Sequence, residues 1–201
     1  MTDPTAYPEG FQRVRAALAA LGHPHAPVWL EVSARTSQEA ADALGVSVGQ
    51  IAKSVIFRRP AGSAGEGAAG SAAERPAHSR AGSGAEGSAD RAAGREEAAV
   101  LVVTSGDRRV DERRVAAITG KLARADAEFV KARTGFSIGG VAPLAHATPV
   151  LTLIDRELFR FEEIWAAAGH PNGVFKLAPA DLVRLTGGAP VADVVQQAEG
   201  P

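Results

Sequence analysis

Two features of the sequence combine residue types that could bind and act on a small ligand: Lys53, and a glycine-containing loop that runs from Gly139 to Pro143. Gly139 and Gly140 have no Cβ atom, so their backbone can adopt positive φ angles and approach a bound molecule closely. Pro143 then restricts the backbone at the exit of the loop. Lys53 supplies a compact cation on a long stem, which can reach a phosphate. The same glycine spacing also occurs in ordinary strand-to-turn connections, so both interpretations of the loop stay open.

The composition excludes several other kinds of site. The chain has no cysteine, which rules out disulfides, thiolate metal ligands and a cysteine nucleophile. Its five histidines lack the His-x-x-x-His and Glu-x-x-His spacings that place two metal ligands on one helix face, so we expect no metal and no other cofactor. The first ten residues are polar, and no apolar run approaches the length of a membrane span. We therefore expect a cytoplasmic protein with no membrane partner.

The charge of the chain argues against general nucleic-acid binding. The formal net charge of the 201 residues is −1 at pH 7. Residues 60–97 contain no Val, Ile, Leu, Met, Phe, Tyr or Trp, and Ala, Gly and Ser fill 25 of these 38 positions, so we expect a disordered insertion. This segment carries four Arg and six acidic residues, and removing its charge of −2 leaves the rest near +1. Without a basic excess, we expect no DNA partner and only a local contact with RNA.

The hydrophobic pattern predicts alternating helices and strands. Apolar spacing, capping residues and glycine stops predict helices at 11–21, 36–45, 111–119, 126–133 and 179–185. Short apolar runs predict strands at 28–32, 54–57, 98–104, 150–154, 163–167 and 174–177. The second and third of these strands flank the insertion, so we expect a hairpin with the insertion at its tip. The mixture predicts an α+β fold with a mixed sheet flanked by helices, in a single compact domain.

Four segments taken together resemble the YbaK/EbsC family, which includes the prolyl-tRNA synthetase editing domain and its free-standing relatives. These segments are 36–45, 50–57, 135–143 and 151–155. The similarity extends from about Val28 to Val194 without the insertion, so we expect an editing domain at 28–201 and residues 1–27 to be a helical segment of it. The resemblance implies a compact fold with a barrel-like sheet. It also implies a metal-independent trans-editing aminoacyl-tRNA deacylase, which hydrolyses the ester that joins a wrong amino acid to the tRNA 3′ end.

The resemblance also assigns roles to individual residues. Lys53 corresponds to the family's essential lysine, which is expected to hold the 3′-terminal adenosine. The Gly139 to Pro143 loop corresponds to the family's Gly-x-x-x-Pro loop, expected to position the ester and the attacking water. Lys53 and Gly139 are thus the expected catalytic positions. The expected substrate-binding residues are Thr36, Gly140, Pro143, Asp155 and His170.

Each of the less specific assignments has a competing structural explanation. Helix capping accounts equally well for Thr36, and turn formation accounts for Asp155. His170 could carry a proton or could be a solvated loop residue. Trp29 and Trp165 lie in predicted strands and are expected in the core rather than as platforms for a base.

The partners follow from the implied reaction. A mischarged aminoacyl-tRNA is the expected substrate, carried by tRNA-Pro or another tRNA that bears a small wrong amino acid. Near-neutral charge suggests that a synthetase or an elongation factor delivers this tRNA. A non-catalytic module that binds a tRNA 3′ end or a synthetase is the alternative function. Neither the amino acid nor the tRNA is fixed by the sequence.

Overall fold

The computed structural model describes residues 7–63 and 97–196, so most of the predicted insertion at 60–97 lies outside the described residues. The described part contains five α-helices: α1 (Glu9–Ala20), α2 (Ser37–Leu44), α4 (Glu112–Thr119), α5 (Ala127–Thr134) and α6 (Pro179–Leu185). It also contains two 3₁₀ helices, η1 (Val48–Gln50) and η3 (Arg156–Arg160). The strands are β1 (Val28–Trp29), β2 (Ile51–Arg59), β3 (Ala98–Ser105), β4 (Ala123–Arg124), β5 (Leu151–Asp155), β6 (Ile164–Ala167), β7 (Gly173–Leu177) and β8 (Val191–Ala192).

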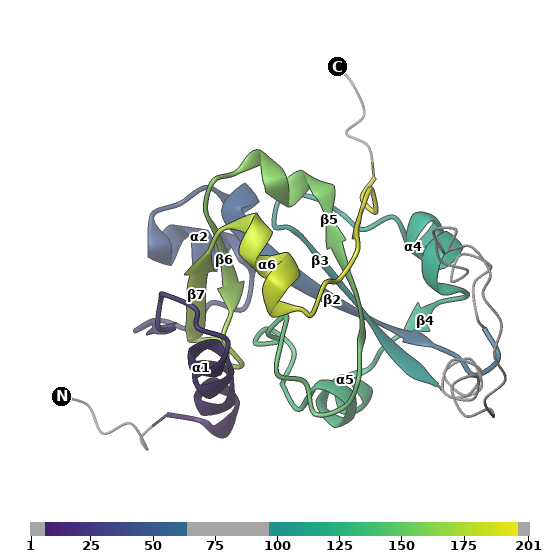
Figure 1. The fold of residues 1–201 in the computed structure, drawn as a ribbon, viewed down its shortest axis with the longest axis horizontal. Helices are drawn as coiled ribbons and strands as arrows, with labels where there is room; N and C mark the ends of the chain where they lie inside the picture. The colour runs from purple at the N-terminus through teal and green to yellow at the C-terminus, as the bar shows by residue number, and fades with distance from the viewer. Residues whose placement is uncertain (1–6, 64–96, 197–201) are drawn as a thin grey trace, which may run out of the picture.

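All eight described strands form one mixed sheet. Its order is β1-β7-β6-β2-β3-β5-β8, and β4 pairs with β2 outside this path. Strands β2 and β3 are antiparallel and pair from Ala52 opposite Ser105 to Arg59 opposite Ala98, which confirms the predicted hairpin. They cross the middle of the molecule in Figure 1. Because β3 pairs with β5 in parallel and β2 pairs with β6 in parallel, the sheet is mixed and the expected α+β fold class is confirmed.

The helix ends form where the capping residues predict them. Thr36 Oγ1 accepts a hydrogen bond from the Glu39 N–H at 3.2 Å, and Glu39 Oε2 accepts one from the Thr36 N–H at 3.0 Å. This capping box starts α2, and Gly45 ends it with a φ of 67°. Hydrogen bonds from the backbone N–H groups of Arg35 and Thr36 lower the pKa of Glu39. Its carboxylate therefore accepts these hydrogen bonds in the ionised form.

Several strand boundaries differ from the prediction. Strand β2 extends beyond the predicted 54–57 because it pairs with β3 along its whole length. Strand β1 has only two residues because the chain leaves the sheet after Trp29 and bonds to the β6–β7 loop, where the Leu30 N–H donates to the Asn172 carbonyl at 2.7 Å. Strands β4 and β8 were not predicted, since two residues are too few to produce a periodic pattern.

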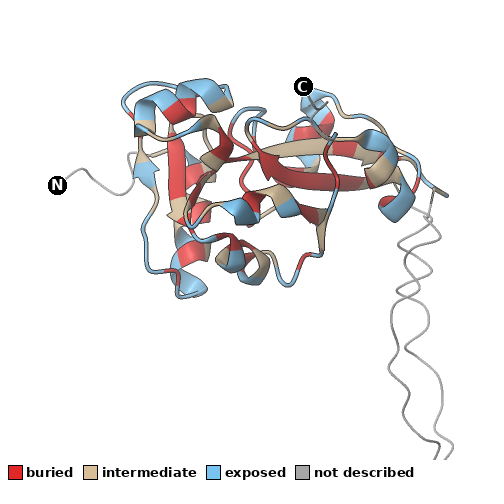
Figure 2. Ribbon diagram, turned by 90° about the horizontal axis from the view of Figure 1, so that it is seen from above, coloured by how far each residue is buried: buried red, intermediate tan, exposed pale blue. Residues whose placement is uncertain are grey.

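Three apolar clusters lie against the sheet. The largest joins α1, α6 and the loop after α5 to one face, a second lies beneath α2, and a third lies beneath α4. Figure 2 shows the central strands buried and much of the helix surface exposed. Within residues 7–63 and 97–196, no helix has the length and apolar character needed to cross a membrane.

Candidate functional site

A cavity of about 630 Å³ lies where β2 separates from its neighbours on one edge. On this edge β2 pairs with β6 only at Ile51 and Ala52. Further along it pairs with β4 only at Phe57 and Arg58. The four residues in between, 53–56, have no strand beside them on this edge in the described structure, and all four line the cavity.

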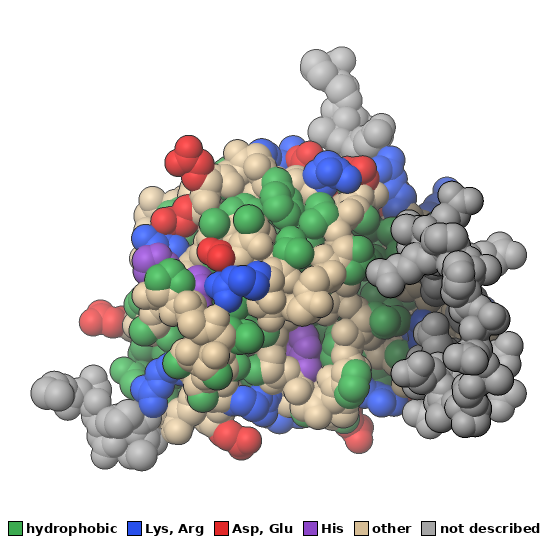
Figure 3. All heavy atoms as spheres, viewed as in Figure 1, with side chains coloured by type: hydrophobic (Ala, Val, Ile, Leu, Met, Phe, Trp, Pro, Cys, Tyr) green, Lys and Arg blue, Asp and Glu red, His purple; other side chains and the backbone are tan. Residues whose placement is uncertain are grey.

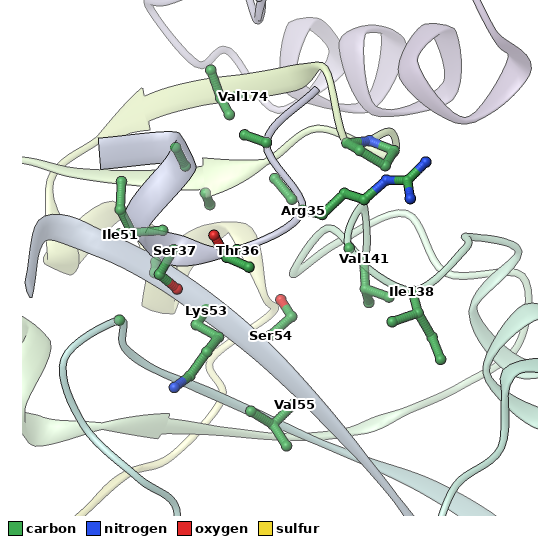
Figure 4. Close-up of a pocket in the computed structure, with 18 of the residues that line it drawn as sticks. Arg35, Thr36, Ser37, Ile51, Lys53, Ser54, Val55, Ile138, Val141 and Val174 are labelled. Atoms are coloured by element: carbon green, nitrogen blue, oxygen red, sulfur yellow. The ribbon is translucent and has the colours of Figure 1, made fainter. Parts of the chain in front are cut away.

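The cavity brings together several residues that the sequence singled out. Lys53 comes from β2, Thr36 precedes α2, and Gly139 lies in the loop after α5. Figure 4 shows the side chains of Lys53 and Thr36 among the residues that line the cavity. The other predicted residues, Gly140, Pro143, Asp155 and His170, are not part of its lining.

Lys53 is half-buried and fixed at its tip. Its Nζ donates a hydrogen bond to the Arg108 carbonyl oxygen at 2.8 Å, which leaves two of the three ammonium donors for other partners. Burial lowers the pKa of Lys53, and the Arg109 cation acts in the same direction, while the Asp107 carboxylate opposes them. A partly desolvated ammonium group interacts more strongly with an anion than a fully hydrated one does.

The loop that holds Lys53 is itself braced by charged side chains. Arg108 Nε is 3.0 Å from Glu157 Oε2. Arg160 joins Glu157 to Asp107, and Ser105 Oγ donates to Asp107 Oδ1 at 2.8 Å. The Arg160 guanidinium and the Ser105 hydroxyl lower the pKa of Asp107 despite its partial burial. Sequence reasoning missed this network, because its members come from separate segments and form no local pattern.

The glycine-containing loop folds as a tight turn. The Gly140 N–H donates to the Ser137 carbonyl at 3.0 Å, and Gly139 has a φ of 88°, as the third residue of a type II turn requires. A Cβ atom on Gly139 would lie 3.8 Å from Arg35 and Pro171, which is ordinary contact. A Cβ atom on Gly140 would lie 2.7 Å from His170 Cα, which is a clash. The first glycine is thus required by its backbone angle and the second by close packing.

The turn does not form a nucleophile elbow, although residues 135–139 spell Gly-x-Ser-x-Gly. In an elbow the serine sits between a strand and a helix. Here the segment follows helix α5, which ends at Thr134, and Ser137 contributes its carbonyl oxygen to the turn. Among the described residues there is also no group of three or more His, Cys, Asp or Glu arranged to hold a metal ion.

Helix α1 anchors the same loop through Arg13. Arg13 Nε donates to the Ala145 carbonyl at 3.0 Å, and Nη2 donates to the Thr134 carbonyl at 3.1 Å. The guanidinium carbon lies 4.4 Å from the centre of the Phe136 ring. Pro143, which is buried, lies between these anchors and fixes the loop instead of lining the cavity. Nothing in the local sequence of α1 distinguishes Arg13 from a solvated helix residue, so the sequence did not reveal it.

His170 lies outside the cavity lining and contacts residues next to it. Its ring stacks on Trp29, with ring centres 4.8 Å apart, and its Nδ1 accepts a hydrogen bond from the Asn172 N–H at 3.1 Å. Burial lowers the pKa of His170, which favours the neutral ring that this hydrogen bond requires. The adjacent Pro171 lines the cavity, and the His170 backbone packs on Gly140. His170 therefore supports two wall segments and does not face the cavity itself.

Asp155 lies in the core rather than at the cavity. It is fully buried at the end of β5, and its Oδ2 accepts a hydrogen bond from Thr104 Oγ1 at 2.9 Å. Burial raises the pKa of Asp155, although the Thr104 hydrogen bond acts in the opposite direction. Asp155 therefore joins β3 to β5 and does not line the cavity; its substrate-binding role stays a prediction, beside the structural role that its contacts support.

Two polar atoms of cavity-lining residues have no hydrogen-bond partner among the described residues. They are Ser54 Oγ, on β2, and Trp165 Nε1, on β6, and both atoms are buried. The sequence predicted Trp165 as core, and it does pack against the cluster beneath α2, but it also lines the cavity. No sequence signal pointed to Ser54, because a serine inside a strand is unremarkable without knowledge of its neighbours.

Comparison with known proteins identifies the protein family to which this chain belongs. A family profile described as the aminoacyl-tRNA editing domain matches residues 90–185. The structure of a candidate trans-editing enzyme for prolyl tRNA synthetase aligns over 95% of this chain and 99% of its own, with 34% identity and a TM-score of 0.71. The chain belongs to the YbaK-like family of aminoacyl-tRNA editing domains, as the sequence motifs predicted.

A bacterial protein and a second solved structure are also similar to this chain over most of its length. The YwhH protein of Bacillus subtilis (strain 168) is 29% identical over 153 residues, which are 76% of this chain and 75% of YwhH. A scaffold protein used for computational grafting of epitope backbones is 33% identical, and the alignment covers 94% of this chain and 99% of the scaffold with a TM-score of 0.70. The similarity spans almost the whole length of both solved structures, so the fold is shared as a unit.

Proposed function

We propose that this protein is a free-standing aminoacyl-tRNA deacylase that hydrolyses the ester of a mischarged tRNA. One observation carries the proposal: Lys53 and Gly139, from distant parts of the chain, line the same cavity. A cation suits the anionic end of a tRNA, and a turn with exposed backbone suits a reacting carbonyl group. Both features therefore lie where a single aminoacyl ester could contact them.

In the proposed reaction, a water molecule attacks the carbonyl carbon of the ester. The carbonyl oxygen takes up negative charge, and the bond from the carbonyl carbon to the ribose oxygen then breaks. The attacking water gives up one proton and the ribose oxygen gains one, so the products are the free amino acid and a tRNA with an intact 3′-terminal ribose. The Gly140 N–H is engaged with Ser137, so we assign the Gly139 N–H as the loop's donor to the developing oxyanion.

Lys53 binds the 3′-terminal nucleotide in this account. The Arg108 carbonyl holds one ammonium proton and leaves the others for a phosphate or ribose oxygen. Because the bracing network fixes Arg108, the ammonium group is already oriented before the tRNA arrives. A substrate held in this way needs less ordering at the reacting carbon, which lowers the entropic part of the barrier.

The partners and the location are proposed on the same basis. Lys, Arg, Asp and Glu side chains are interspersed on the face seen in Figure 3, without one basic patch, which fits a local contact with the tRNA end. A synthetase or an elongation factor would then deliver the tRNA, and the protein would act in the cytoplasm. None of the proposed steps requires a metal ion.

A panel of mischarged tRNAs tests the proposal. The full chain is incubated in excess with seryl, alanyl, threonyl and cysteinyl esters, and loss of the ester is followed over time. We expect one or more esters to be hydrolysed well above the buffer rate, with no change after treatment with EDTA. Lys53→Met should abolish this activity, whereas Lys121→Ala, which changes an exposed lysine outside the cavity, should not. If every ester decays at the buffer rate, the proposal is wrong.

A further inference from the structure

The cavity has two sides, separated by the unpaired edge of β2. Successive residues of a strand point to opposite faces of the sheet, so Lys53 and Ser54 face different sides. Figure 4 shows the Lys53 amine and the Ser54 hydroxyl pointing away from each other. An ester whose nucleotide end is held by Lys53 would therefore reach the second side with its amino-acid end.

Apolar side chains of the main core cluster line the cavity on the side that Ser54 faces. Ile56, Ala125, Val130 and Val141 line the cavity there and pack on the main core cluster. Val103, opposite Ser54 on β3, offers no polar side chain either. These apolar side chains offer no hydrogen-bond partner to the side chain of an aminoacyl ester, whereas the Ser54 hydroxyl can offer one.

Ser54 Oγ has no hydrogen-bond partner within residues 7–63 and 97–196. The atom is buried and makes no hydrogen bond within the described residues, while the residue as a whole is partly exposed. A change of the χ1 rotamer can move the hydroxyl toward the cavity without moving the backbone. A ligand hydroxyl would then supply a partner that Oγ lacks, whereas a methyl group would supply none.

We propose that Ser54 is a specificity-determining residue that makes the cavity favour esters of small hydroxylated amino acids, serine or threonine, over alanine. The inference rests on the proposed deacylase function and concerns the amino-acid end of the same site. The Gly139 turn holds the ester carbonyl, and the side chain next to it enters the apolar side and meets the Ser54 hydroxyl. Discrimination comes from the hydrogen bond that the hydroxylated side chain gains there.

The test compares seryl and alanyl esters on the same tRNA, so that tRNA recognition cancels. With kcat/KM as the measure, the wild-type chain should prefer the seryl ester by about tenfold or more, a difference of about 1.4 kcal/mol. Ser54→Ala should remove most of this preference by slowing the seryl ester while leaving the alanyl ester nearly unchanged. Ser63→Ala, outside the cavity, should behave as the wild type.

The melting temperature of Ser54→Ala gives an independent readout. Because the substitution removes a buried hydroxyl without a partner, the variant should melt at the same temperature as the wild type or higher. A clear loss of stability would show that the hydroxyl has a structural partner and would overturn the inference. Equal rates for both esters, unchanged in Ser54→Ala, would overturn it as well and leave the deacylase proposal standing. Hydrolysis of neither these nor any other ester would refute both.

Discussion

Replacing Gly139 by alanine should impair the reaction more than it impairs the fold. Gly139 has a φ of 88°, in a region where an L-residue with a Cβ atom is disfavoured by about 1–2 kcal/mol. Its new Cβ would meet Arg35 and Pro171 at 3.8 Å, so contacts add no further cost. For a domain of this size, we expect a decrease in melting temperature of roughly 2–8 °C.

Gly187→Ala is the matched control for the backbone cost. Gly187 has a φ of 74°, and an added Cβ there would meet nothing within 4 Å. It follows helix α6, is not part of the cavity lining, and should lose about as much stability as Gly139→Ala. Only Gly139→Ala distorts the turn at the ester, and a displacement of about 1 Å there can reduce the rate about 100-fold.

The assay pairs thermal melting with single-turnover hydrolysis of the best ester. We expect similar melting temperatures for the two variants and a large loss of rate for Gly139→Ala alone. Gly140→Ala extends the series, because its Cβ must move away from the His170 backbone from 2.7 Å to about 3.4 Å, which costs about 1–3 kcal/mol. If Gly139→Ala is as active as Gly187→Ala, the turn does not position the ester and this reasoning is refuted.

Three further predictions follow from single side chains. Because burial lowers the pKa of Lys53, the ratio of catalysed to uncatalysed hydrolysis by the wild-type chain should fall as pH rises, before the ordinary lysine value of 10.5 is reached. Burial raises the pKa of Asp155. The stabilisation that its protonated form provides is therefore present below pH 3.8 and is lost as the pH rises through the raised pKa. Asp155→Asn should flatten the pH dependence of the melting temperature above about pH 4 and should keep deacylation. Arg13→Met leaves two carbonyl groups without their donor, which should lower the free energy of unfolding in urea by about 1–3 kcal/mol and slow hydrolysis, whereas Arg113→Met should do neither.

Local chemistry made much of the fold predictable. The capping box at Thr36, the acidic start of α5 at Asp126 and the apolar runs on either side of the insertion each act over a few residues. Patterns of this kind can be read from neighbouring positions, so the helices and the β2–β3 hairpin follow from them. Lys53 and Gly139 were singled out by family motifs, which are local in sequence; both line the cavity, and their catalytic role stays a prediction.

Long-range contacts account for what could not be predicted. The cavity exists because β2 pairs with β6 at Ile51 and Ala52 only, and no local pattern encodes where that pairing stops. Arg13 acts on carbonyl groups more than a hundred positions away in the chain. Asp155 was predicted at the site because it ends a strand, as the family's acidic residue does, but it is buried, and its carboxylate is bonded to Thr104, 51 positions earlier in the chain. A contact between residues so far apart leaves no local pattern in the sequence.

Multiple turnover on a mischarged tRNA tests the central claim most directly. A catalytic amount of the full chain is mixed with an excess of the best ester, and released amino acid is counted against the amount of protein. The account predicts many amino acids released per protein molecule, and none above the buffer rate for Lys53→Met. Stable binding of the tRNA with its ester intact would contradict the account and favour a non-catalytic binding module.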